Sequence, residues 1–429
     1  MRFILDLLYL LAAVAYSPLV VYRLVRYDRY RNGWAQRFGN ITRKDFSKRC
    51  IWLHAVSVGE VNATRTVVRE LENRFGDFEI VISTTTDTGF ARASALFGDR
   101  LQVFYFPFDF SWIMHRAFRQ IQPAVCLLME LEVWPNFVQV AEQLNTPVII
   151  VNGRISDKSF SRYEKLKPVI KNIFKKLTLV LAQTEQYAQR FVRIGCSAEK
   201  VIVTGSLKYD TAQIADKIEG ADELAAQLKI NERLWVAGGT GNDEEKILLD
   251  VYQNLKQRDQ FDDLRLVIIP RKPERFDEVA QLIEQTGFGL IRYSKVKDAA
   301  DSSKFDSIIL GDTMGDLRKF YSLATVIFVG RSLVSMGGSD MAEAAALGKP
   351  TIFGPYAFNF KQTVDDLLAG YGAVMVKNKD ELLAIVQKCL LEPTYADRIA
   401  RNGRDVIRKN QGATAKTIDQ IAKILNHVR

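Results

Sequence analysis

The chain has 429 residues, of which 48% are hydrophobic and 25% are charged, and its formal net charge is +9. This length is ample for two domains with full cores. Four widely separated cysteines and only three histidines argue against a disulfide framework and a histidine-rich metal site, so no metal centre is predicted and the cysteine usage suits the cytoplasm.

The first predicted element is an apolar segment from Phe3 to Tyr22, in which Asp6 is the one charged residue. A run of about twenty apolar residues can span the hydrocarbon core of a bilayer. Nine basic and two acidic residues follow between Tyr22 and Arg49, and they contribute +7 of the net charge of +9. The excess charge is therefore concentrated beside the apolar segment and does not form a distributed nucleic-acid-binding face.

These features predict that residues 1–30 form a membrane anchor with a basic juxtamembrane segment. Each cation near an anionic leaflet contributes about 1 kcal/mol to the attraction between the protein and the membrane. The positive-inside rule places the rest of the chain in the cytoplasm. Two other interpretations stay open. One is an amphipathic helix that lies in the interface, which Asp6 and Pro18 allow, and the other is a signal peptide cleaved at Ala13-Val14-Ala15.

After the anchor, short apolar runs alternate with helical patterns in two successive series. The predicted strands are Cys50–Val56, Glu79–Ser83, Val103–Pro107, Ala124–Met129, Val148–Val151 and Leu177–Ala182, then Leu234–Ala237, Leu266–Pro270, Gly287–Tyr293, Ser307–Leu310, Thr325–Gly330 and Pro350–Phe353. Strands of about five residues that alternate with helices indicate parallel sheets. We therefore predict an α/β protein with two doubly wound, Rossmann-like domains at 31–207 and 208–405, and a C-terminal helix at 406–429 that could cross back to the first domain.

Ligands of such sheets bind outside the carboxyl ends of the strands, so the active site is expected in the cleft between the two domains. In the first domain, Glu60 follows a strand and stands at the start of the next helix. The helix field favours its carboxylate form, which a general base needs, although an acid that only stabilises the helix would look the same. Glu130 and Glu132 close another strand, and alternation would point both side chains into the cleft.

In the second domain, the segment Phe328–Pro355 leads from a strand into a glycine-rich loop. Ser339 or Asp340 can cap the helix that follows, and Glu343 on its first turn could accept hydrogen bonds from ribose hydroxyls. An ordinary turn with a solvated glutamate is the alternative. Three further loops end strands of the same sheet, at Gly238–Gly241, Ile269–Arg275 and Gly311–Asp316. Together they resemble a nucleotide pocket, but none matches a P-loop or a dinucleotide fingerprint, so neither ATP hydrolysis nor NAD chemistry is predicted.

The segment Asp157–Lys176 contains seven basic residues among apolar ones such as Phe160 and Ile170. A basic surface that carries apolar side chains suits anionic lipid. A solvated helix face packed on its own domain is the other interpretation.

The chain resembles the 3-deoxy-D-manno-octulosonic acid (Kdo) transferases of lipopolysaccharide biosynthesis. These enzymes are glycosyltransferases of the GT-B fold. The resemblance covers nearly the whole chain. The matching motifs, in order, are His54–Glu60, Glu130–Asn136, Asn152–Ser156, Thr204–Asp210, Pro270–Phe276, Gly311–Leu317 and Gly354–Phe360.

The resemblance implies an inverting transferase that moves Kdo from CMP-Kdo, a co-substrate, to a lipid A precursor (lipid IVA), with no further cofactor. It makes Glu60 the base and Glu132 a second required acid. It places Arg154 and Lys208 near the cleft. It also implies an enzyme on the cytoplasmic face of the inner membrane, in contact with anionic lipids. The residues that would hold CMP are Arg271, Gly311, Met314 and Glu343, with Ser339 and Asp340 in the same loop.

The chain departs from the family pattern around the expected nucleotide pocket. Arg331 replaces a glycine, Ser339-Asp340 replace His-Asn, and Gly241 and Lys272 replace two further histidines. Asp340 adds negative charge near a phosphate, which should weaken CMP binding unless Arg331 compensates. A GT-B transferase or epimerase with another nucleotide sugar, and an inactive membrane-bound homologue, are therefore the alternative functions. The sequence does not indicate an oligomeric state.

Overall fold

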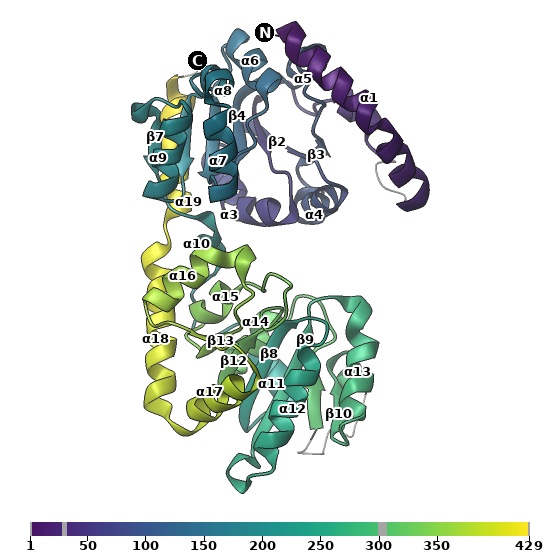
Figure 1. Cartoon of the computed structure of the whole chain (residues 1–429), viewed down its shortest axis with the longest axis vertical. Coiled ribbons are helices and arrows are strands. Elements are labelled where there is room, and N and C mark those ends of the chain that lie inside the picture. Colours follow the sequence, from purple (N-terminus) through teal and green to yellow (C-terminus); the bar gives the residue numbers. More distant parts are fainter. Residues whose placement is uncertain (1, 28–31, 299–306, 428–429) are drawn as a thin grey trace. The chain divides into compact units, whose positions relative to one another are not determined.

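The computed structural model describes residues 2–27, 32–298 and 307–427. The chain forms two compact units, the first from Met1–Thr211 together with Gln411–Arg429 and the second from Ala212–Asn410. Each unit contains one seven-stranded sheet in which every pairing is parallel (Figure 1). The prediction of an α/β protein with two doubly wound halves is therefore confirmed.

The sheet of the first unit has the strand order β3-β2-β1-β4-β5-β6-β7. Its strands are β1 (Arg49–His54), β2 (Phe78–Thr84), β3 (Gln102–Tyr105), β4 (Pro123–Met129), β5 (Val148–Gly153), β6 (Leu179–Ala182) and β7 (Val201–Val203). The helices of this unit are α1 (Arg2–Tyr27), α2 (Trp34–Arg37), α3 (Val58–Arg74), α4 (Asp87–Phe97), α5 (Ser111–Ile121), α6 (Pro135–Gln143), α7 (Asp157–Lys165), α8 (Lys167–Phe174), α9 (Glu185–Ile194), η1 (Ala198–Lys200), α10 (Leu207–Thr211) and α19 (Ala413–His427).

The sheet of the second unit has the order β10-β11-β9-β8-β12-β13-β14. Its strands are β8 (Arg233–Thr240), β9 (Leu264–Pro270), β10 (Gly289–Arg292), β11 (Ser307–Leu310), β12 (Val326–Val329), β13 (Thr351–Phe353) and β14 (Val374–Met375). Its helices are α11 (Ala221–Gln227), α12 (Glu244–Lys256), η2 (Asp259–Phe261), η3 (Pro273–Arg275), α13 (Phe276–Glu284), η4 (Tyr293–Asp298), α14 (Leu317–Leu323), α15 (Met341–Ala346), η5 (Phe358–Phe360), α16 (Lys361–Ala369), α17 (Lys379–Leu391) and α18 (Pro393–Asn410). Every predicted strand is present, whereas the edge strands β7 and β14 are not among the predicted strands.

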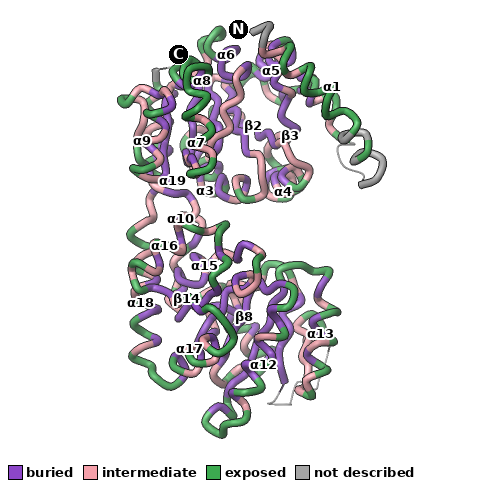
Figure 2. Tube along the Cα trace, in the orientation of Figure 1, coloured by how far each residue is buried: buried purple, intermediate pink, exposed green. Residues whose placement is uncertain are grey.

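Both sheets have buried, near-continuous apolar strands, as expected where helices cover the two faces of a parallel sheet (Figure 2). In β1, Trp52 packs into one apolar cluster and Leu53 into another on the opposite face. The order of strands reverses between β1 and β4 in the first unit and between β8 and β12 in the second. The loops that follow these four strands therefore lie at the switch points, where doubly wound sheets bind ligands.

The C-terminal helix α19 belongs to the first unit. Thr414 lies 2.8 Å from Thr66 of α3 through their hydroxyl oxygens, and Asp419 forms an ion pair with Arg74 at the end of the same helix. Asp210 accepts hydrogen bonds from the backbone of Gly412 and Thr414, which ties the start of α19 to α10.

The predicted apolar segment forms helix α1, which is fixed to the first unit by polar contacts. Asp6 accepts hydrogen bonds from the backbone N–H and the hydroxyl of Ser111 and from the amide of Asn136. Tyr9 donates to Asp109 at 2.9 Å. Across the residues that the structure describes, no helix is both long enough and apolar enough to cross a bilayer, which does not support the predicted spanning anchor.

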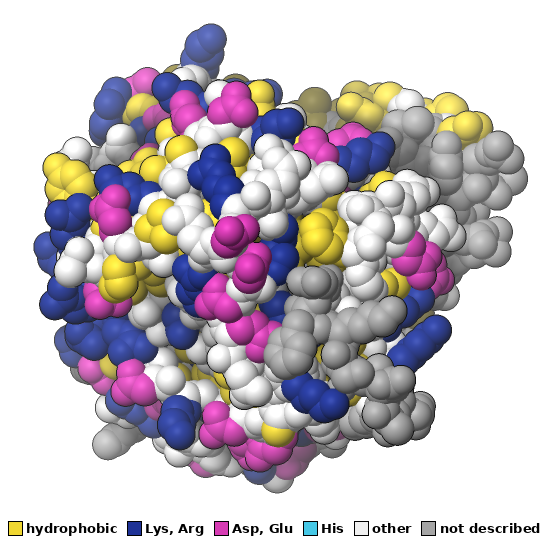
Figure 3. Space-filling model, turned by 90° about the horizontal axis from the view of Figure 1, so that it is seen from below, with side chains coloured by type: hydrophobic (Ala, Val, Ile, Leu, Met, Phe, Trp, Pro, Cys, Tyr) yellow, Lys and Arg dark blue, Asp and Glu magenta, His cyan; other side chains and the backbone are white. Residues whose placement is uncertain are grey.

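Part of the predicted juxtamembrane cation cluster is structural. Arg43 is 4% exposed and pairs with Glu79 at 2.6 Å, and Arg37 is 5% exposed with its guanidinium 4.3 Å from the ring centre of Tyr105. These two side chains are buried in contacts of their own, so they are not part of a membrane-facing basic group. On the face drawn in Figure 3, acidic and basic side chains are intermixed.

Candidate functional site

The first candidate acid, Glu60, is held at the switch point of the first sheet by a capping box. Ser57 caps α3 by accepting a hydrogen bond from the backbone of Glu60. The Glu60 carboxylate in turn accepts from the backbone N–H of Val56 and from the Ser57 hydroxyl, both at 2.9 Å. This reciprocal arrangement stabilises the helix start and also fixes the carboxylate in one orientation.

The second pair of acids lies in the loop after β4, beside the same switch point. The backbone of Glu130 has φ 52°, and β4 ends one residue earlier, at Met129. The prediction that strand alternation orients Glu130 and Glu132 is therefore wrong, since neither residue is in a strand. Glu132 instead accepts a hydrogen bond from the indole nitrogen of Trp134 at 3.1 Å.

These three carboxyl groups interact with one another. Burial raises the pKa of Glu132 to about 7, and the charge of Glu60 adds to the rise. Burial also raises the pKa of Glu60; the hydrogen bonds from Val56 and Ser57 oppose this rise, and the charge of Glu130 adds to it. The expectation that the helix field would favour the Glu60 carboxylate is thus outweighed by desolvation and by like charge.

The other two residues predicted for this side lie on neighbouring elements. Arg154 directly follows β5, which pairs with β4, so it is at the same carboxyl edge of the sheet as the acids. Lys208 is on the short helix α10, whose start is tied to β5 by a hydrogen bond from the Leu207 backbone to the Asn152 side chain.

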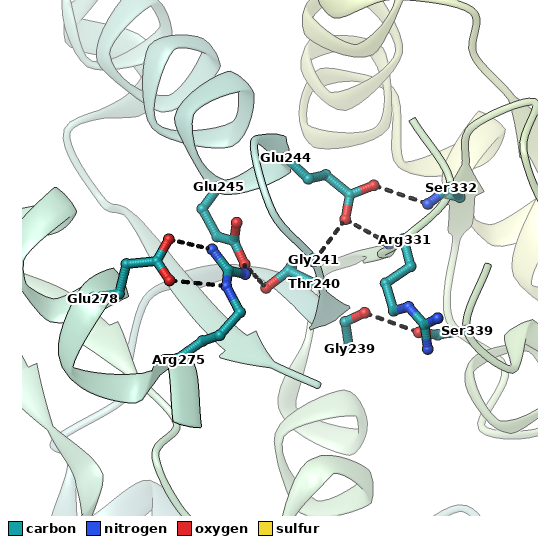
Figure 4. A network of polar contacts seen from close by, with 10 residues as sticks. All are labelled: Gly239, Thr240, Gly241, Glu244, Glu245, Arg275, Glu278, Arg331, Ser332 and Ser339. Atoms are coloured by element: carbon teal, nitrogen blue, oxygen red, sulfur yellow. Dashed lines mark hydrogen bonds and ion pairs between the residues drawn. The ribbon is translucent and has the colours of Figure 1, made fainter. Parts of the chain in front are cut away.

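In the second unit, the four predicted loops follow β8, β9, β11 and β12 and so share one edge of a parallel sheet. One difference from the prediction concerns the backbone N–H groups of the loop after β12 (Figure 4). The carboxylate of Glu244, on α12, accepts hydrogen bonds from the backbone N–H groups of Arg331, Ser332 and Leu333 in the loop after β12. These amides are already bonded to a protein carboxylate, so they do not form a phosphate site.

Glu244 also binds the backbone of Gly241 and is fully buried, as is its neighbour Glu245. Neither residue was predicted from the sequence. The pattern that could have indicated them is a pair of consecutive acids at the start of a helix that follows a glycine-rich loop. Glu245 binds Thr240 at 2.8 Å and Arg275 at 2.5 Å, and Arg275 also pairs with Glu278. Arg275 is therefore committed to ion pairs, unlike the exposed Arg271 of the same segment.

The predicted nucleotide residues gather around the start of α15. Asp340 is the residue that caps this helix, through a hydrogen bond from the Ala342 backbone at 3.0 Å, and Ser339 instead donates to the carbonyl of Gly239 at 2.8 Å. Burial raises the pKa of the Tyr321 hydroxyl, the charges of Glu343 and Asp340 raise it further, and the charge of Arg271 lowers it. A charged cluster from two loops thus surrounds Tyr321, which sequence reasoning did not single out.

The remaining predicted residues line the same sheet edge. Gly311 follows β11, and a Cβ atom there would lie 2.7 Å from the Ile269 side chain, so only glycine fits without a shift. Met314 is 65% exposed. Arg331 has φ 59°, a left-handed conformation that favours glycine, and its guanidinium donates to the carbonyl of Met336 at 3.0 Å.

The structure therefore brings the predicted residues together as two groups, one in each unit. Two doubly wound units of this kind are the architecture of GT-B-like folds. A glycosyltransferase structure from Rickettsia africae ESF-5 has a TM-score of 0.56 and covers 89% of this chain and 99% of its own at 14% identity, a likeness of fold alone.

Sequence comparison defines the family. The 3-deoxy-D-manno-octulosonic-acid transferase (kdotransferase) family model matches residues 32–211. The 3-deoxy-D-manno-octulosonic acid transferase of Haemophilus influenzae is 32% identical over 94% of this chain and 93% of its own length, and that of Bordetella pertussis is 31% identical over 86% of each. The chain belongs to the Kdo transferase family and is a glycosyltransferase of lipopolysaccharide biosynthesis.

Proposed function

We propose that this enzyme transfers Kdo from CMP-Kdo to a lipid A precursor, lipid IVA, with Glu60 as general base. The first unit binds the acceptor and the second binds the donor. The observation that carries this proposal is the group of Glu60, Glu130 and Glu132 at the switch point of the first sheet. Burial and neighbouring negative charge raise the pKa of Glu60 and of Glu132, and carboxyl groups perturbed in this way are typical of acid–base sites.

The reaction is an inverting displacement. The acceptor hydroxyl oxygen attacks the anomeric carbon of Kdo, the bond from that carbon to the phosphate oxygen of CMP breaks, and the electron pair leaves with CMP. The hydroxyl proton passes to Glu60. A base is most effective when its pKa is near the working pH, so the raised pKa of Glu60 favours this role. The displacement balances without a further cofactor.

Within the second unit, Arg271 is suited to the CMP phosphate because its side chain is exposed and lies at the carboxyl end of β9. Glu343 is suited to the ribose hydroxyls, since it stands on the first turn of α15 beside the loop after β12. Gly311 lets the backbone approach the nucleotide closely, and Met314 offers an apolar surface. Ser339 and Asp340 shape the same loop through the contacts described above.

We further propose that α1 attaches the enzyme to the cytoplasmic face of the inner membrane as an interfacial helix. Its side chains Leu7, Leu8, Leu10, Leu11 and Val14 are between 53% and 64% exposed. Asp6 does not oppose this, because it is bonded to the protein. An exposed aromatic cluster of Trp34, Phe38 and Trp112 suits the headgroup region.

The test compares Glu60→Gln with the full-length, detergent-solubilised enzyme. The assay supplies a CMP-Kdo generating system and tetraacylated lipid A precursor, and mass spectrometry reads the product. Glutamine can keep the capping box, so the fold is retained while the base is lost. We expect loss of transfer with CMP binding kept. Glu70→Gln, a change at a partly exposed acid on the same helix, is the matched control and should transfer normally.

Transfer by Glu60→Gln at the rate of the control would show that the assigned base is wrong. A parallel binding screen addresses the donor. Binding of CMP without binding of UDP supports the proposal, whereas a preference for UDP would favour a transferase or epimerase with another nucleotide sugar.

A further inference from the structure

A cavity of about 420 Å³ lies in the first unit, directly against Glu132. Ten of the eleven described residues that line it are apolar or aromatic, Glu132 is its one carboxyl group, and none of the eleven is Lys or Arg. The walls come from the loop before α6, from α7 and α8, and from Tyr9 of α1. A cavity of this size can hold part of a small-molecule ligand.

The lining is unsuited to a phosphate or a free sugar. A phosphate would meet the Glu132 carboxyl and no cation within the cavity. Two lining side chains, Ile173 and Phe174, are buried, and Phe174 makes an edge contact with Tyr163 at 5.8 Å between ring centres. Leu166, another lining residue, is 55% exposed. A lining of apolar and aromatic side chains fits a hydrocarbon chain.

Exposed cations are chain neighbours of residues that line the cavity. Lys165 and Lys167 flank Leu166 in the chain, and Lys171 follows Ile170, another lining residue; all three lysine side chains are exposed. An apolar cavity beside exposed cations is complementary to a molecule that carries both an alkyl chain and phosphate groups. A neutral lipid would use the cavity without using the cations.

The N-terminal helix α1 contributes Tyr9 to the lining of this cavity. Hydrogen bonds through Asp109 connect Tyr9 to the segment that carries Glu132. The Asp109 carboxylate accepts a hydrogen bond from the Tyr9 hydroxyl. It also accepts hydrogen bonds from the backbone N–H groups of Asn136 and Phe137 at the start of α6, at 2.9 and 2.7 Å. The residues just before α6, Glu132 to Pro135, form one wall. Asp109 therefore links the hydroxyl of Tyr9 to the start of α6, next to the cavity wall formed by Glu132 to Pro135.

We propose that this cavity binds one acyl chain of the phosphorylated acceptor, so that the chain positions the acceptor hydroxyl near the carboxyl group cluster. The inference rests on the proposed function and adds the acyl chain as the recognised group. Because Glu132 lies at the cavity and interacts with Glu60, chain binding and proton transfer occur in the same part of the first unit. The helix α1 then forms one wall of the acceptor site in addition to any membrane contact.

The test measures transfer kinetics with the full-length enzyme in neutral detergent and two acceptors, the tetraacylated precursor and its deacylated phosphorylated disaccharide. The variants are Leu166→Gln and, as matched control, Val169→Gln. Both positions are similarly exposed, at 55% and 59%, and lie one turn apart, but only Leu166 lines the cavity. Neither change removes a buried side chain, so both variants should fold.

We expect Leu166→Gln to raise KM for the acylated acceptor about tenfold, the effect of partial loss of apolar burial, and to leave KM for the deacylated acceptor unchanged. Val169→Gln should change neither. Equal effects of the two variants, or an equal loss by Leu166→Gln on both acceptors, would overturn the proposal. So would reduced binding of Leu166→Gln to phosphatidylglycerol vesicles with normal KM in detergent, since the cavity would then take a bilayer lipid. Failure of the wild-type enzyme to transfer to either acceptor would instead contradict the proposed function.

Discussion

Replacing Glu132 by Gln should stabilise the first unit while it impairs transfer. The pKa of Glu132 is raised by burial and by Glu60 from an ordinary 4.5 to about 7. The folded state therefore holds the Glu132 proton more tightly than the unfolded state does, and this contribution to stability is lost as the pH rises from about 4.5 to about 7. Above pH 7 the unfavourable ionisation costs roughly 3 kcal/mol, at about 1.4 kcal/mol for each tenfold change in proton affinity.

Glutamine cannot ionise, and its side-chain oxygen can still accept the hydrogen bond from the Trp134 indole. Compared with the wild type, Glu132→Gln should therefore gain roughly 2–3 kcal/mol at pH 8 and almost nothing at pH 4.5. Denaturant unfolding followed by tryptophan fluorescence is a suitable assay. Four of the chain's five tryptophans are in the first unit, at positions 34, 52, 112 and 134.

The control is Glu199→Gln, a change at an exposed carboxyl group in η1 of the same unit, which should shift stability equally little at both pH values. A gain of stability in Glu132→Gln that does not depend on pH would refute the reasoning, because a change in packing would then explain it better than ionisation. An absence of any gain at pH 8 would show that the Glu132 carboxylate is not held at a cost.

Two further changes test the second unit and the basic segment. Asp340→Asn keeps a good helix cap at α15 and removes a negative charge from the proposed nucleotide site, so CMP should bind several-fold more tightly by calorimetry; an unchanged or weaker affinity would remove Asp340 from the site. Arg43→Met removes the arginine partner of the largely buried Glu79 carboxylate. Because a largely buried charge is then left without that partner, the free energy of unfolding should fall by about 3–5 kcal/mol. Adding Glu79→Gln should recover much of that loss, and a double variant as unstable as the single one would contradict the pairing argument.

The fold was predictable from local pattern because buried parallel strands are short, continuous apolar runs that differ from the helices between them. Strand β4, for example, is the run Pro123–Met129, bounded by a helix before it and acids after it. Residues that follow such strands must lie at one edge of the sheet, which is why Glu60, Glu132 and Arg271 could be placed at sheet edges from the sequence, whereas their roles stay predictions.

Contacts between distant segments were not predictable in the same way. Glu244 is 87 residues before Arg331 in the chain, yet its carboxylate binds the backbone of a loop that was expected to line the nucleotide pocket. No local pattern states whether a backbone N–H group faces a ligand or a protein carboxylate. The burial of Arg43 against Glu79 is a similar case, since a sequence shows the charge of an arginine but not its partner.

The N-terminal helix shows how a single long-range contact changes the interpretation of a pattern. In the sequence, Asp6 is an unfavourable charge within an apolar run, and it weakens the argument for insertion into lipid. In the fold, Asp6 binds the start of α5 and the side chain of Asn136, so the charge faces protein and the exposed leucines can face lipid without it. The same contact fixes the direction of α1 and thereby places Tyr9 at the cavity beside Glu132. The contacts of Asp6 therefore help to set the orientation of the helix, and with it the place of Tyr9 in the proposed acceptor site.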